Sequence, residues 1–136
     1  MTTPLYSLMG FVFWTALLVL LIGVIRVGQV VTGKAAVNSF PSGQPHGSDF
    51  YWRLSRAHMN CLENLPLFAA VVLTGHVSGL TAPLFGTLAA TYAFARVGQT
   101  LAHVSSAGVA AVNVRFTFFS VQMVCLVWMA LMVVGR

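Results

Sequence analysis

Long stretches without a charged side chain limit the fold of this chain more than any other feature of its sequence. Asp, Glu, Lys and Arg are absent from residues 1–25, 64–95, 97–114 and 116–135. A helix needs about 20 apolar residues to cross the hydrocarbon core of a bilayer, and each stretch approaches or exceeds that length. Only 7% of the residues are charged, whereas a soluble domain carries roughly a quarter. The sequence therefore predicts an integral membrane protein and excludes an ordinary soluble globule.

Apolar runs separated by turn residues predict an all-α bundle of four transmembrane helices, which forms a single domain over residues 1–136. The expected helices span about residues 5–31, 50–75, 82–103 and 112–134. Glycine and proline interrupt helices, and five of them fall between the first two helices, at Gly33, Pro41, Gly43, Pro45 and Gly47. A loop is therefore expected over about residues 32–49. The first apolar run is too long for a signal-peptide core, so we expect it to be retained as a helix.

Basic residues predict the orientation of the bundle. Six of the seven lie near the 32–49 loop or near the connection between the third and fourth helices, and only Arg136 lies at the opposite end. Cytoplasmic connections carry the excess of Lys and Arg. We therefore expect both connections on the cytoplasmic side, both termini outside, and a multi-pass protein of a bacterial inner membrane. The net charge of +5 does not indicate nucleic-acid binding, because the basic residues lie in or beside membrane segments.

Histidine and cysteine positions give no indication of a metal site. The four histidines are dispersed along the chain, and Cys61 and Cys125 lie in different predicted helices. No pair has the short spacing of a metal-binding or disulfide framework. We therefore expect neither a bound metal nor a disulfide.

Polar residues form a stripe along the second predicted helix. At 100° per residue, Arg53, Arg56, Asn60 and Glu63 project within an arc of about 80°. Each charge near the membrane centre costs roughly 2.5–3.5 kcal/mol on insertion scales. A stripe of this kind indicates either a binding site or charge pairing between helices.

The third helix carries a similar polar face at the same end of the bundle, formed by Tyr92, Arg96, Gln99 and His103. Arg115 lies at the start of the fourth helix, also at this end. One glutamate among several arginines leaves an excess of positive charge. That excess requires an anionic partner, either a lipid headgroup or a substrate.

The segment RAHMNCLENLPLF, residues 56–68, resembles the RAxxNxxExxP signature of the MAPEG superfamily, the membrane-associated proteins in eicosanoid and glutathione metabolism. It is especially similar to the leukotriene-C synthase and microsomal glutathione transferase branches. The YAFAR segment at residues 92–96, the four helices and the long first loop also resemble this family. The resemblance implies a homotrimer with glutathione bound between protomers near the cytoplasmic side.

The resemblance also implies roles for individual residues. It implies that Arg115 stabilises the glutathione thiolate and is the catalytic residue, and that Arg56, Asn60 and Glu63 hold the tripeptide. Further cofactor-binding positions are expected at Arg53, Arg96, His103, Lys34 and Gln99. This assignment is chemically consistent, because arginines bind carboxylates through paired hydrogen bonds and a nearby cation lowers the pKa of a thiol.

The function expected from these features is a glutathione transferase, with glutathione peroxidase activity as a further expectation. Its thiolate would attack lipophilic electrophiles that enter from the bilayer. Departures from the eicosanoid-forming enzymes at Met59, Asn64, His103 and Phe116 favour general conjugation or peroxide reduction. The alternative is a non-catalytic member that binds membrane lipid or presents it to a partner. A small multidrug transporter is disfavoured, because the first helix has no acid and arginines surround Glu63.

Overall fold

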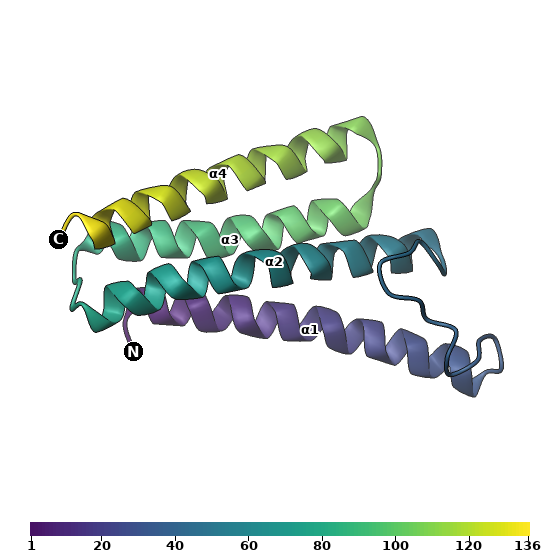
Figure 1. Ribbon diagram of the computed structural model, residues 1–136. Helices are drawn as coiled ribbons and strands as arrows, with labels where there is room; N and C mark the ends of the chain where they lie inside the picture. Colours follow the sequence, from purple (N-terminus) through teal and green to yellow (C-terminus); the bar gives the residue numbers. More distant parts are fainter.

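Four α-helices and no strands make up the protein in a computed structural model that describes all of residues 1–136 (Figure 1). The helices are α1 (Thr3–Val31), α2 (Asp49–Val77), α3 (Pro83–Ser105) and α4 (Val109–Val134). The expected all-helical architecture is confirmed. Each helix is extended by one to three residues at one or both ends relative to expectation, most at the start of α4, where Ala110 and Ala111 favour helix.

Residues at the helix starts explain where the chain enters each element. Pro4 and Pro83 lie in the first turns of α1 and α3, where their missing N–H groups have no helical partner to lose. Ser48 caps α2, because its hydroxyl accepts a hydrogen bond of 3.1 Å from the backbone N–H of Tyr51. Asp49 follows in the first turn, where a negative charge is favoured.

The helices pack in an open arrangement. Helix α3 contacts all three others, α2 contacts both α1 and α4, and α1 and α4 do not contact one another. Figure 1 shows both chain termini at one end, and the α1–α2 and α3–α4 connections together at the other. This second end, the loop end, is where the sequence places most of the basic residues.

Aromatic rings fill the core where α1, α2 and α3 meet. Phe68 and Tyr92 stack almost parallel, with ring centroids 4.3 Å apart, and Phe11 tilts against both. Close helix approach depends on glycine at two seams. A Cβ at Gly75 would lie 2.6 Å from the Phe85 ring, and one at Gly98 would lie 2.6 Å from the ring of Phe118.

The outer surface of the bundle is apolar. Only 22 of 136 residues are buried, and large hydrophobic side chains are exposed along all four helices. Soluble monomers do not expose contiguous apolar surface on this scale. Helices α1 and α4 are long and apolar enough to cross a membrane. This surface is suited to contact with lipid or with other copies of the chain.

Candidate functional site

Helices α2 and α3 join at the loop end through polar contacts from the predicted stripe. The side-chain amide of Asn60 lies 3.3 Å from Nδ1 of His103. About two turns earlier on α2, Nε of Arg53 donates to the backbone oxygen of Val104 at 3.0 Å. Asn64 donates to the carbonyl of Asn60 at 2.8 Å. Two of the four residues of the expected stripe, Arg53 and Asn60, therefore form contacts in the seam between these two helices.

A pocket of about 240 Å³ opens beside this seam, between α2, α3 and α4. Its polar lining consists of Asn60, Gln99, His103 and Arg115, and its apolar lining of Val112, Phe116 and Phe119. Four of the nine predicted site residues thus meet in one pocket within a single chain. We refer to it as the Arg115 pocket.

Arg115 enters this pocket from the first turns of α4 with unused hydrogen-bonding capacity. The residue is half-buried, and its Nε is buried without a hydrogen-bond partner in the chain. A guanidinium remains protonated in proteins. The pocket therefore presents a permanent cation with a free donor, which is suited to an anion.

Gln99 is held in place by a residue that sequence reasoning did not select. Nε2 of Gln122, on α4, donates to Oε1 of Gln99 at 2.9 Å and to the carbonyl of Phe118 at 3.0 Å. Gln122 is fully buried. The sequence did indicate Gln122 in one respect: it is a lone glutamine in an apolar stretch, and a polar side chain inside a membrane bundle requires a hydrogen-bond partner.

Arg56, Glu63 and Lys34 lie outside the Arg115 pocket. Arg56 and Glu63 are exposed on the outer face of α2, and Lys34 is exposed just after α1. Glu63 is the middle residue of α2, so in a spanning helix it lies near the membrane centre. A single chain therefore does not gather all the charges that the sequence selected.

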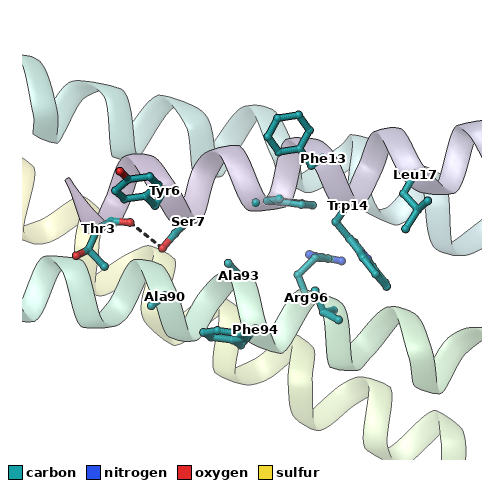
Figure 2. A pocket seen from close by; sticks show the side chains of 13 residues that line it. Thr3, Tyr6, Ser7, Phe13, Trp14, Leu17, Ala90, Ala93, Phe94 and Arg96 are labelled. Atoms are coloured by element: carbon teal, nitrogen blue, oxygen red, sulfur yellow. Dashed lines mark hydrogen bonds between the residues drawn. The ribbon is translucent and has the colours of Figure 1, made fainter. Parts of the chain in front are cut away.

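Arg96 lines a different cavity from Gln99 and His103. It lines a groove between α1 and α3, and the Arg115 pocket does not include it. Figure 2 shows its guanidinium pointing from α3 toward α1, beside Trp14. Only 1% of its surface is exposed. The structure thus separates Arg96 from Gln99 and His103, although all three were expected on one polar face.

The α1–α2 loop is fastened by a cluster that the sequence did not indicate. Nε of Arg26 donates to the Tyr51 hydroxyl at 2.7 Å, and Nε2 of His46 lies 3.3 Å from the same oxygen. The Arg26 guanidinium also lies over the ring of Phe40, 5.2 Å from its centroid. Arg26 was assigned only to membrane topology, because nothing local in the sequence pairs it with a tyrosine 25 residues away.

Comparisons with known proteins agree with these features. A family model described as the MAPEG family matches residues 4–135, essentially the whole chain. A comparison with curated proteins gave no match. The chain belongs to the MAPEG family of membrane-associated proteins in eicosanoid and glutathione metabolism.

Proposed function

We propose that this protein is a membrane-embedded glutathione transferase in which Arg115 stabilises the thiolate. The observation that carries the proposal is the Arg115 pocket, where a half-buried guanidinium with a free Nε faces Asn60, Gln99 and His103. Membership of the MAPEG family supports glutathione as the co-substrate. The proposed pocket lies at the loop end, which the positive-inside rule assigns to the cytoplasm, and we propose a bacterial inner membrane as its location.

The chemistry proposed for Arg115 is electrostatic. An unperturbed thiol has a pKa of about 8.5 and is roughly 3% ionised at pH 7, whereas one lowered to about 6.5 is roughly 75% ionised. The arginine cannot act as a base, because it does not release its proton. It instead favours the thiolate form of glutathione, and the thiol proton is released to solvent. The thiolate sulfur then forms a C–S bond with the electrophile as the leaving group departs.

Peroxide reduction would begin from the same thiolate. The sulfur attacks the terminal oxygen of a lipid hydroperoxide, the O–O bond breaks, and the lipid alcohol leaves after taking up a proton. A second glutathione then reduces the sulfenic acid and releases glutathione disulfide and water. The proposed hydroperoxide reaches the pocket from the bilayer, as other lipophilic substrates do.

Oligomerisation completes the proposed site. Glutathione carries two carboxylates and one ammonium, which need more polar partners than the four in the Arg115 pocket. Arg56, Glu63 and Lys34 are exposed in the single chain, and a charge near the membrane centre costs roughly 2.5–3.5 kcal/mol when it faces lipid. We propose a homotrimer in which these residues, with Arg53, meet the tripeptide between neighbouring protomers.

An Arg115→Ala variant tests the assigned role. Conjugation of glutathione with a dinitrochlorobenzene is expected to lose roughly 20-fold in kcat at pH 7, because the thiolate fraction falls by about that factor. The loss is expected to shrink as the pH rises through about 8.5, where the thiol ionises without assistance. Glutathione affinity, measured by calorimetry in detergent, is expected to change by much less than kcat.

Arg136→Ala is the matched control, because Arg136 lies at the opposite end of the bundle, where its side chain donates a hydrogen bond to the Ser78 carbonyl. An Arg115→Ala enzyme with unchanged turnover at pH 7 would contradict the role given to this arginine. Absence of glutathione binding at millimolar concentration in the unaltered protein would instead favour the non-catalytic, lipid-binding alternative.

A further inference from the structure

A second cavity, far more apolar than the Arg115 pocket, runs between α1 and α3. It has a volume of about 560 Å³, which is within the range of small-molecule sites. On α1 it extends from Thr3 to Leu17, or about 21 Å at the rise of an α-helix. That length exceeds the thickness of one leaflet of hydrocarbon, about 15 Å. We refer to this cavity as the α1–α3 groove.

The groove is open along its side, and the guanidinium of Arg96 lies at its inner wall. Phe13 and Phe94 on its walls are 66% and 78% exposed, so its side faces the surroundings of the bundle. Figure 2 shows Arg96 reaching into the space between the two helices, with Trp14 and Ala93 near it. An apolar chain can therefore enter sideways from lipid and bring a polar group to Arg96.

Arg96 is a buried cation without an acidic partner, and its polar neighbour is the neutral hydroxyl of Tyr92. Its Nε and one terminal nitrogen, Nη2, are buried and make no hydrogen bond. The chain has only two acids, Asp49 and Glu63, and neither lines the groove. The guanidinium lies over the Phe11 ring at 5.6 Å. This contact contributes about 2 kcal/mol when desolvated, which is less than the several kcal/mol that burial of one ion costs.

We propose that the α1–α3 groove binds a long-chain fatty acid, with its carboxylate on Arg96 and its chain against the aromatic walls. Charge complementarity selects an anion, and two free N–H groups on one guanidinium match the two oxygens of a carboxylate. This site is separate from the glutathione site, because Gln99 lies one turn along α3 and faces Gln122 on α4.

The depth of Arg96 selects a fatty acid over a phospholipid. Arg96 lies close to the middle of α3, so in a spanning helix it is far from the headgroup region. A phospholipid would have to carry its phosphate and two chains into the hydrocarbon core. A fatty acid enters the core in its neutral, protonated form and then ionises beside the guanidinium, which favours the charged carboxylate.

Tryptophan quenching tests this proposal directly, because Trp14 lines the groove. Substituting Trp52 and Trp128 by Phe leaves Trp14 as the sole tryptophan of residues 1–136. Titration with dibromostearate in detergent is expected to quench it saturably, and oleate is expected to reverse the quenching. Methyl oleate and phosphatidylcholine are expected to compete at least tenfold less effectively, because neither presents a free carboxylate. Glutathione is expected not to compete.

Further variants in this single-tryptophan background distinguish the contribution of the Arg96 charge from that of the open volume of the groove. Arg96→Gln is expected to weaken dibromostearate binding at least tenfold, and Arg96→Lys to restore part of it. Ala93→Phe fills the groove while Arg96 remains, and is expected to abolish saturable quenching. Circular dichroism reports whether each variant folds. If Arg96→Gln does not fold, Ala93→Phe and the comparison of acid with ester decide the question.

Three outcomes would overturn the proposal. Methyl oleate competing as strongly as oleate would show that the carboxylate is not recognised. Full-strength binding by folded Arg96→Gln would remove the assigned partner. Displacement of dibromostearate by phosphatidylcholine at equal concentration would identify the groove as a general lipid contact. Each result is independent of glutathione turnover, so failure here leaves the transferase proposal to its own test.

Discussion

Gln122 shows how a single buried side chain prepares the Arg115 pocket. Its Nε2 donates to Gln99 on α3 and to the Phe118 carbonyl, while its own Oε1 is buried without a partner. The Gln122→Leu variant loses two hydrogen bonds, each of which contributes about 1 kcal/mol to the free energy of unfolding. Removal of the unpaired, buried acceptor partly offsets this loss. We expect the unfolding midpoint to change little, while KM for glutathione rises severalfold because Gln99 is no longer oriented.

Thr117→Val is the control for this substitution, because the Thr117 hydroxyl donates only to a carbonyl of its own helix, that of Asn113. Steady-state kinetics at several glutathione concentrations, together with thermal unfolding in detergent, distinguish binding from stability. A Gln122→Leu enzyme that unfolds much earlier with an unchanged KM would show that Gln122 acts only as a structural link between helices.

At the residue scale, helical periodicity predicted which side chains share a face but not which neighbour that face meets. Asn60 and Arg53 contact α3, whereas Arg56 and Glu63, within the same 80° arc, are exposed. The arc is wide enough to cover both a helix seam and an open surface. Arg96 and His103 share a face of α3 by periodicity but line different pockets, because the position of α1 against α3 cannot be read from one helix.

The α1–α2 loop is held in its conformation by contacts with the Tyr51 hydroxyl. Arg26 donates to its hydroxyl at 2.7 Å, and His46 lies 3.3 Å away. In Tyr51→Phe both side chains lose this partner, and a hydrogen bond to a charged group contributes about 1.5–3 kcal/mol. We expect faster amide hydrogen exchange in residues 38–48, measured by mass spectrometry, with little change in α3 and α4.

Tyr6→Phe is the matched control for the loop, because Tyr6 is 62% exposed and its hydroxyl makes no hydrogen bond within the chain. Equal exchange in residues 38–48 of Tyr51→Phe and the unaltered protein would show that the Tyr51 hydroxyl does not fasten the loop. Nothing in the sequence singles out Tyr51 for this role, whereas the structure buries it to 1% exposure.

Packing of α3 against α4 depends on the absence of a side chain at Gly98. A Cβ there would lie 2.6 Å from the Phe118 ring, and overpacking of this kind costs about 1–3 kcal/mol. Gly98→Ala is therefore expected to lower the thermal midpoint and reduce activity, since Gln99 and Arg115 lie on the same two helices. Phe118→Leu added to Gly98→Ala is expected to recover part of both losses.

Gly23→Ala is the matched control for Gly98→Ala, because alanine at position 23 is not expected to destabilise the protein. Nothing lies within 4 Å of a Cβ at Gly23, and alanine is favoured over glycine in a helix by about 1 kcal/mol. This variant is expected to be neutral or slightly stabilised. Equal destabilisation by both substitutions would contradict the close contact inferred for Gly98.

At the element scale, the helices were predicted more fully than their packing. Apolar runs and turn residues placed all four within a few residues, although only α1 and α4 are apolar enough to cross a membrane by composition alone. The clusters of glycine and proline also located the first loop, where Gly33, Gly43 and Gly47 have positive φ. Which helices touch was not predictable, because lipid and neighbouring helices are equally apolar and hydropathy cannot distinguish them.

At the scale of the whole molecule, a single chain leaves charged side chains exposed at the middle of α2, where a membrane protein would place them against lipid. The exposed face of α2 contains Arg56, Met59 and Glu63 in the central part of the helix, and α2 is not among the two helices apolar enough to cross a membrane by composition alone. We expect neighbouring copies to cover this face, as the proposed homotrimer requires. Native mass spectrometry after release from detergent is expected to show particles of three chains, each of 14.6 kDa.

Cysteine cross-linking tests whether the α2 face is the contact. Met59 is 46% exposed and Phe94 is 78% exposed on α3, while native Cys61 and Cys125 are buried. A bifunctional maleimide is expected to link chains through Met59→Cys more efficiently than through Phe94→Cys, which is the more exposed position. Exposure alone predicts the reverse order, so the ranking distinguishes contact from accessibility. Monomeric particles that bind glutathione with full affinity would show that one chain suffices and that Arg56 and Glu63 are not supplied by a neighbour.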